Sequence, residues 1–132
     1  MSSPSIRSAR RQIVIADPDH THRARTWNAL TDRGHAVEVV DSVAALQVLL
    51  RQRPPDAIVI DTTFGDLAPA ASIARVRRCT TRTLVVMQLS QPGDDVDEVL
   101  RGGADELVRL PCSDAELVAR VEKLLRVINP GS

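Results

Sequence analysis

Acidic and hydroxyl residues follow several short apolar runs of this chain, at the points where strands would end. Asp17 follows the first run, Asp61 follows the third and Ser90 follows the fourth. Carboxylates that gather without a compensating charge raise one another's pKa, so such a group is typical of a site that binds a hard divalent cation such as Mg²⁺ through oxygen ligands. One aspartate alone is weak support, because aspartate is also common in turns and helix caps. The set of positions indicates a cation site more strongly than any single residue does.

The elements that must position these residues alternate between two kinds. Short aliphatic and β-branched runs predict strands, and the longer segments between them have the apolar spacing of helices. We expect strands over residues 13–16, 36–40, 57–60, 83–87 and 106–109, and helices over about 20–33, 43–52, 67–78, 94–102 and 114–127. Strictly alternating strands and helices predict an α/β fold, a doubly wound (βα)5 sandwich in which a five-stranded parallel sheet has helices on both faces. Ligands of such sheets bind beyond the carboxyl ends of the strands, where the polar residues above lie.

The apolar pattern of the runs predicts their places in the sheet. The first, third and fourth runs are continuously apolar, which is typical of strands covered on both faces, whereas the second run is more polar and suits an edge. Gly34 is expected to end the first helix. The last helix has the clearest amphipathic stripe and is expected to begin at Ser113 or Asp114, with Glu116 placed to complete a capping box.

Composition places the chain among ordinary globular domains. Hydrophobic residues make up 43% and charged residues 26% of its 132 residues. Lys plus Arg and Asp plus Glu each number 17, so no net charge draws the protein onto nucleic acid or an acidic membrane surface. Aromatic residues are only 2%, too few for a surface that stacks bases. We therefore expect no direct binding to nucleic acid or to a membrane.

The ends of the chain and its two cysteines indicate the bounds of the folded domain and its cellular compartment. Residues 1–11 are polar and rich in Ser and Arg, so we expect a disordered leader, then a folded domain over 12–128 and a linker or chain end over 129–132. No apolar run approaches the length of a membrane span, and the N-terminal segment lacks the apolar core of a signal peptide. Cys79 and Cys112 are expected to be reduced structural thiols. These features favour a cytoplasmic protein.

In their order and spacing, five stretches resemble the receiver domain of bacterial two-component response regulators, the CheY-like domains with a flavodoxin-like fold. The stretches are IVIAD at 13–17, RGHAV at 33–37, PDAIVID at 55–61, GADE at 103–106 and ELVARV at 116–121. The resemblance covers residues 12–128. It implies a role in phosphorelay signal transduction, with a histidine kinase or another signalling protein as the partner.

The resemblance also assigns roles at the strand ends. It implies that Asp61 is the phosphoacceptor, whose carboxylate attacks the phosphoryl group of a kinase phosphohistidine. It implies a Mg²⁺ site made by Asp17, Asp61 and the carbonyl of Thr63. Ser90 then supplies the hydroxyl that turns toward the phosphoryl group. The Mg²⁺ is expected to be weakly bound or absent, because the sequence departs from the family at several of the surrounding positions.

The departures fall on the residues that assist the phosphoacceptor. Members of the family carry two adjacent acids after the first strand, but here the second position is Pro18, and Asp19 stands one place further on. Asp19 begins the first helix, where capping is the favoured role, and ligation of the metal by Asp19 is the open alternative. Leu110 occupies the place of a lysine whose charge-assisted contact to the phosphoryl group contributes about 1.5 to 3 kcal/mol.

The fifth predicted strand departs from the family pattern as well. Leu107 occupies the position of an aromatic switch residue, so the usual coupling of a hydroxyl shift to a ring rotation lacks its moving part. Arg109 neighbours Leu110 but should point to the opposite face of the strand, because side chains alternate along a strand. The Leu110-Pro111 bond is expected to be cis, as is common in the family. The pattern resembles the pseudo-receivers, which often signal through protein–protein interaction.

The helix at 94–102, the strand at 106–109 and the helix at 114–127 form the face through which relatives dimerise or bind output domains. The charged residues there are Arg101, Asp105, Glu106, Arg109, Glu116 and Arg120. They either form pairs with a second chain in a homodimer or form ordinary pairs within one solvated surface, and the sequence leaves both readings open.

The residues favour one of three functions. The favoured one is a degenerate receiver, not an enzyme, in which Asp61 is phosphorylated weakly or not at all and the surface binds a protein. The alternative is a working Mg²⁺-dependent receiver. A flavodoxin-like cofactor binder or hydrolase is disfavoured, because neither GxGxxG nor GxSxG occurs. His20 and His22 are expected to be solvated, and Trp27 to be a partly buried packing residue.

Overall fold

The computed structural model describes residues 10–128, so the predictions for residues 1–9 and 129–132 lie outside the described residues. Arg11 was assigned to the leader by sequence, but it already belongs to the fold. Its N–H donates to His35 Nδ1 at 3.2 Å, and its carbonyl accepts from the N–H of Ala36 at 2.9 Å. Arg11 therefore contacts the folded domain, one residue before its predicted start.

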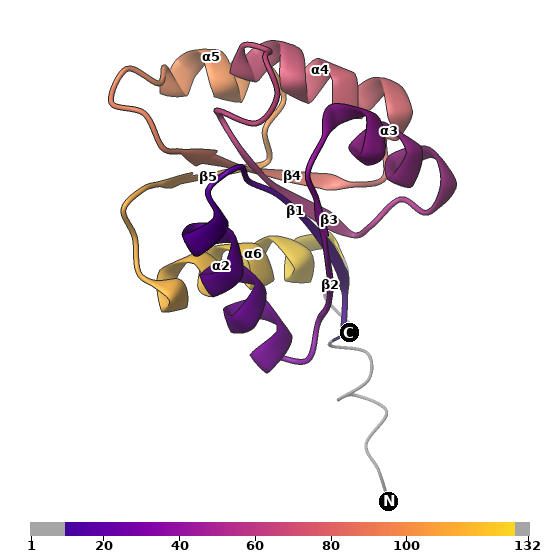
Figure 1. Cartoon of the computed structure of the whole chain (residues 1–132), viewed down its shortest axis with the longest axis vertical. Helices are drawn as coiled ribbons and strands as arrows, with labels where there is room; N and C mark the ends of the chain where they lie inside the picture. The colour runs from indigo at the N-terminus through magenta and orange to yellow at the C-terminus, as the bar shows by residue number, and fades with distance from the viewer. Residues whose placement is uncertain (1–9, 129–132) are drawn as a thin grey trace, which may run out of the picture.

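Strands and helices alternate along the described chain (Figure 1). The strands are β1 (Gln12–Ala16), β2 (Ala36–Val40), β3 (Ala57–Asp61), β4 (Leu84–Leu89) and β5 (Glu106–Arg109). The helices are α2 (His20–Asp32), α3 (Val43–Gln52), α4 (Pro69–Cys79), α5 (Val96–Arg101) and α6 (Asp114–Ile128). All strand pairs are parallel in the order β2-β1-β3-β4-β5, which confirms the doubly wound sandwich.

Helices cover both faces of the sheet, α3, α4 and α5 on one face and α2 and α6 on the other (Figure 1). Alternate side chains of the central strands divide between two aliphatic cores. Ile58 and Ile60 of β3 face the α3–α4–α5 side, whereas Val59 faces the α2–α6 side. Strand β3 is buried throughout and β2 is at the edge with exposed residues, as the hydrophobic pattern predicts.

The ends of several elements differ from the sequence prediction by one or two residues, those of β4 and α5 among them. Strand β4 begins one residue later and continues through Gln88 and Leu89, because the ladder with β3 reaches the pair Asp61 and Gln88. Helix α5 is shorter than the predicted 94–102, since the carboxylate of Asp95 accepts from the N–H of Glu98 and caps the helix there. The longer β4 has a direct consequence for the site, because it brings the side chain of Gln88 level with Asp61.

Helix α6 closes the α2–α6 side of the sheet. Ser113 Oγ accepts from the N–H of Glu116 at 3.0 Å, so the predicted cap at Ser113 is confirmed. Leu117, Val121 and Leu125 are buried at the spacing of one helix face. Gly34 has φ +91°, which shows that the chain after α2 uses the left-handed turn that glycine permits.

Glu122 of α6 also ties the helix to the turn after α2. Its carboxylate accepts from Arg33 Nη2 at 2.9 Å and from Nε2 of the buried His35 at 2.8 Å. Burial acts to raise the pKa of Glu122, but the bonds from Arg33 and His35 outweigh burial and lower that pKa below its usual 4.5.

Acid is therefore expected to weaken the fold through Glu122. A carboxyl whose pKa is lower in the folded state stabilises the fold fully above its unfolded pKa of 4.5 and loses that contribution as pH falls through the folded value. The contribution is about 1 kcal/mol, since Arg33 is exposed and screened. Urea unfolding at a series of pH values should show a shallower acid loss in Glu122→Gln than in wild type. Equal slopes would contradict this assignment.

None of the helices within residues 10–128 combines the length and the apolar character that crossing a membrane requires.

Candidate functional site

The carboxyl ends of β1, β3 and β4 bring two aspartates together where the winding of the sheet reverses. Asp17 directly follows β1, and Asp61 is the last residue of β3. Their side chains are almost fully buried, with exposed fractions of 2% and 3%. In a doubly wound sheet this is the usual place for a ligand, as the sequence predicts. Two carboxylates in a buried position need charge or hydrogen-bond donors to offset their desolvation.

Asp61 receives its donors from three residues. The N–H of Thr63 lies 2.9 Å from Asp61 Oδ2, and the Thr63 hydroxyl donates to the same oxygen. Ser90 Oγ, directly after β4, lies 2.8 Å from Asp61 Oδ2. Gln88 Nε2 lies 3.1 Å from Asp61 Oδ1. The hydroxyl of Ser90 therefore points at Asp61, and its contact with a phosphoryl group stays a prediction.

Asp17 is held by His22, Gln88 and its own chain. His22 Nδ1 lies 2.8 Å from Asp17 Oδ2, and Gln88 Nε2 lies 3.1 Å from the same oxygen. The N–H of Asp19 donates to Asp17 Oδ1 at 2.9 Å. The prediction that His22 is solvated is wrong. The first turn of α2 directs His22 back over the carboxylate, while the exposed His20 contacts Arg23.

The pairing of Asp17 with His22 shifts the pKa of both groups. Burial acts to raise the pKa of Asp17, but hydrogen bonds from His22, the Asp19 N–H and Gln88 outweigh burial and lower the pKa below 3.8. The bond to Asp17 raises the pKa of His22 above 6.5, against burial, which acts to lower it. The pair therefore favours a carboxylate next to an imidazolium.

Asp19 performs the capping role that the sequence favoured. Its Oδ1 accepts from the N–H of His22 at 3.0 Å, and it is the N-cap residue of α2. Its carboxylate thus serves the start of the helix. Pro18 stands between Asp17 and this cap. Ligation of a metal by Asp19, or by the carbonyl of Thr63, stays a prediction.

Sequence reasoning missed Gln88, the residue that joins the two aspartates. It has no exposed surface, and its single Nε2 atom donates to both Asp17 and Asp61. Its Oε1 is buried without a hydrogen-bond partner in the described structure. A signal was present, since Gln88 is the one polar residue within the apolar strand LVVMQL. The predicted strand ended at residue 87, so Gln88 was assigned to a loop.

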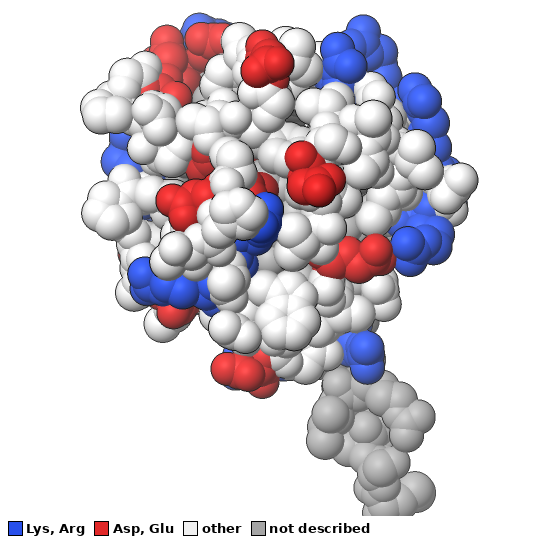
Figure 2. Space-filling model, in the orientation of Figure 1, with Lys and Arg blue, Asp and Glu red and all other residues white. Residues whose placement is uncertain are grey.

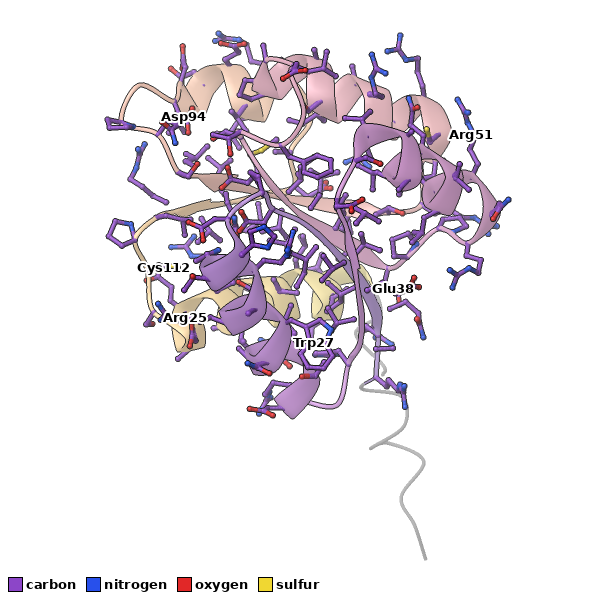
Figure 3. All side chains as sticks on the ribbon, viewed as in Figure 1. Arg25, Trp27, Glu38, Arg51, Asp94 and Cys112 are labelled. Carbon is purple, nitrogen blue, oxygen red and sulfur yellow. The ribbon has the colours of Figure 1, made fainter. Side chains whose placement is uncertain are left out.

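A second set of hydrogen bonds links Ser90 to the loop before α5. Thr62 Oγ1 lies 3.4 Å from Ser90 Oγ and donates to Asp94 Oδ2 at 2.7 Å. The N–H of Gln91 donates to the same oxygen of Asp94 at 3.0 Å. Asp94 lies on the loop that leads from β4 into α5 (Figure 3). A polar path thus runs from Asp61 through Ser90 and Thr62 to this loop.

The fifth strand places aliphatic groups on both of its buried sides. Leu107 packs against the α3–α4–α5 core, and Leu110 packs against the α2–α6 core. Arg109 is exposed, in agreement with the alternation expected along the strand. The Leu110-Pro111 peptide bond is cis, as predicted. Neither Leu107 nor Leu110 contributes a charge or a hydrogen-bond donor to the acidic site.

Charged residues of the α5–β5–α6 face pair mainly within the chain. Asp105 Oδ2 accepts from the N–H of Val85 and from Arg77 Nη2, each at 2.8 Å. Arg120 lies 3.7 Å from Glu106 and 3.5 Å from Glu116. Both charge signs also occur on the face drawn in Figure 2. Arg101 and Arg109 are exposed and form no ion pair with any other residue of 10–128.

The donors around the two aspartates do not fit a divalent cation. Mg²⁺ needs oxygen ligands with free lone pairs, but the Gln88 amide donates to both Asp17 Oδ2 and Asp61 Oδ1, and His22 contacts Asp17 Oδ2 as well. Within the described part of the chain, no group of three or more His, Cys, Asp or Glu side chains is arranged to hold a metal ion. The observed arrangement supplies both aspartates with hydrogen-bond donors from the protein, and His22 adds a basic group at Asp17 alone.

Known proteins share this sequence pattern and fold. The model of the response regulator receiver domain matches residues 13–122. Response regulator MprA of Mycobacterium leprae is 33% identical over 123 residues, which cover 90% of this chain and 53% of the relative. Transcriptional regulatory protein AfsQ1 of Streptomyces coelicolor is 32% identical over 116 residues, 86% of this chain and 51% of the relative. The chain thus spans about half the length of these curated relatives.

A solved structure agrees with these matches. The crystal structure of a putative response regulator from Chloroflexus aurantiacus J-10-fl has a TM-score of 0.75 and 26% identity, and the match covers 87% of this chain and 97% of that one. The match of the family model extends over the whole stretch that carries Asp17, Asp61 and Ser90. This chain belongs to the family of response regulator receiver domains.

Proposed function

We propose that this domain is a degenerate receiver of a two-component system, which acts in the cytoplasm by binding another protein and depends little on phosphorylation of Asp61. Receiver domains are generally non-enzymatic signalling domains that interact with histidine kinases and typically bind Mg²⁺ at the phosphorylation site. Asp61 keeps the phosphoacceptor position in this proposal, and the domain is not an enzyme. This domain differs from the family pattern in the groups that surround Asp61.

One observation carries the proposal: Gln88 joins the two buried carboxylates, His22 pairs with Asp17, and Leu110 packs against the α2–α6 core. Phosphoryl transfer depends on positioned positive charge at the transferring group. Leu110 supplies none, and the N–H groups of Gln88 and His22 occupy the aspartate oxygens. Asp61 can still serve a structural purpose here, because it holds Thr63 and Ser90 in place.

The partner surface in this proposal is the α5–β5–α6 face. Leu100 is 48% exposed on α5, and Arg101 follows it at the end of the helix. Arg109 of β5 is likewise exposed and unpaired within the described residues. An exposed apolar side chain and two unpaired arginines on one face suit an acidic partner surface with an apolar centre. The partner is a kinase, another signalling protein or a second copy of the domain.

Asp61→Asn is expected to retain the cellular output of the protein. The amide oxygen of asparagine can still accept from Ser90 and Thr63, so the fold should persist while phosphorylation is abolished. The measurement is complementation of a strain that lacks the gene, with Asp61→Asn compared with wild type.

The matched variant for that experiment is Arg109→Glu, which changes the surface and leaves the acidic site untouched. We expect Arg109→Glu to lose the output because its charge is reversed on the binding face. Loss of output in Asp61→Asn together with retention in Arg109→Glu would refute the proposal and favour a working phosphoacceptor.

A further inference from the structure

We propose that His22 and Gln88 take the structural place of a divalent cation between Asp17 and Asp61, so that the acidic site is complete without metal. The inference rests on the proposed function, since it explains how a receiver keeps two buried aspartates while its phosphorylation chemistry is depleted. It concerns this chain's own side chains, and it can be tested without a phosphodonor.

All four carboxylate oxygens already have donors. Asp17 Oδ1 accepts from the N–H of Asp19, and Asp17 Oδ2 accepts from His22 and Gln88. Asp61 Oδ1 accepts from Gln88, and Asp61 Oδ2 accepts from Thr63 and Ser90. Asp17 Oδ2 and Asp61 Oδ2 each accept at least two of these hydrogen bonds, so a cation that bound either oxygen would have to displace a donor.

The orientation of the Gln88 amide supplies an independent argument. Its Nε2 faces both aspartates, and its Oε1 is left buried without a partner. The reverse orientation would direct Oε1 against two carboxylates, which is unfavourable unless a cation lies between them. In this orientation the amide leaves its oxygen without a hydrogen bond, but its nitrogen donates two hydrogen bonds to charged acceptors. Hydrogen bonds to charged groups are stronger than those between neutral groups. A cation would require the amide to rotate.

His22 supplies the basic group of the arrangement. Asp19 caps α2, and that cap fixes the first helical turn so that His22 Nδ1 reaches Asp17 Oδ2. The side chain of His22 is only 20% exposed, so the contact is well shielded from solvent. Arg23 of the same turn adds a second basic group, with Nη1 donating to the carbonyl of Asp17 at 3.3 Å. The first turn of α2 thus brings a histidine to the Asp17 carboxylate and an arginine to the Asp17 backbone carbonyl.

The experiment compares thermal unfolding with and without millimolar Mg²⁺ in wild type, His22→Ala and Gln88→Thr. Wild type should show no rise in Tm with Mg²⁺. His22→Ala should have a lower Tm without metal and should regain part of it with Mg²⁺, because ligand binding to the folded state raises stability. We expect the apparent Mg²⁺ affinity of each variant to exceed that of wild type at least ~10-fold, which corresponds to the loss of one competing contact.

The matched control is His20→Ala, because His20 lies in the same turn, contacts Arg23 and does not touch either aspartate. It should behave as wild type with and without Mg²⁺. Wild type that binds Mg²⁺ as tightly as His22→Ala would overturn the inference, and so would the absence of any Mg²⁺ effect in both site variants. Gln88→Thr removes the bridging amide independently of His22, so a folding defect in one variant leaves the other to decide.

These results are separable from a failure of the proposed function. Mg²⁺ binding is read from Tm on purified protein, whereas the proposed function is read from complementation by Asp61→Asn. Wild type that binds Mg²⁺ while Asp61→Asn complements would overturn this inference and leave the proposed function standing.

Discussion

A protein that carries Leu110→Lys together with Gln88→Thr should accept a phosphoryl group on Asp61 from acetyl phosphate roughly 10 to 100 times faster than wild type. The lysine adds the charge-assisted contact that Leu110 cannot make, and the threonine frees the oxygens that the Gln88 amide occupies. The aliphatic stem of a lysine can keep the packing of Leu110 against the α2–α6 core. Intact-protein mass spectrometry in Mg²⁺-containing buffer measures the phosphorylated fraction over time.

The control for this gain of reactivity is Leu110→Met in the same Gln88→Thr background. Methionine is of similar length and carries no charge, so it separates the effect of the ammonium from that of the altered packing. Equal rates in the lysine and methionine proteins would show that the missing charge is not what limits Asp61. Asp61→Asn in the lysine protein should abolish the signal and so identify the acceptor.

Leu117→Ala should lower the free energy of unfolding by about 2 to 5 kcal/mol. Leu117 is 1% exposed and packs α6 onto the sheet beside Val121 and Leu125. Truncation removes buried apolar surface and leaves a cavity that the rigid strands cannot fill. A domain of this size has a total stability of about 5 to 15 kcal/mol, so the loss is a large share of it. Urea unfolding followed by circular dichroism measures the change.

Val127→Ala on the same helix is the comparison, since Val127 is 69% exposed. Its effect should stay within about 0.5 kcal/mol, because little surface is removed from the core. A loss in Val127→Ala as large as that in Leu117→Ala would mean that the exposed side of α6 is buried against a second copy of the chain. Repeating the measurement at several protein concentrations would then reveal the dimer.

The fold could be predicted from sequence because its signals are repeated along the chain. Continuous apolar runs placed β1, β3 and β4 in the centre of the sheet, and the more polar run placed β2 at an edge. The errors are local. The end of β4 was misplaced because Gln88 is polar, although its pairing with Asp61 in the ladder extends the strand. Arg11 was assigned to the leader because its bonds to the distant His35 and Ala36 leave no local sequence signal.

The candidate site was predictable in its acids and its hydroxyl but not in its donors. Asp17, Asp61 and Ser90 follow strands, so the topology alone brings them to one edge of the sheet. Gln88 and His22 act through side-chain directions that spacing does not reveal. A histidine in the first turn of a helix is usually solvated, and only the position of Asp17 beneath that turn makes His22 a partner.

A two-dimensional amide NMR titration of wild type with Mg²⁺, and then with beryllofluoride, which stands in for the aspartyl phosphate, tests whether the acidic site is complete without metal. We expect a well-dispersed spectrum that stays unchanged at Asp17, Asp61 and Ser90 after both additions, since His22 and Gln88 already donate to the carboxylates. Shifts at these amides that spread into β5 would contradict this expectation. They would show that the site accepts a metal and a phosphoryl group and that phosphorylation switches the domain.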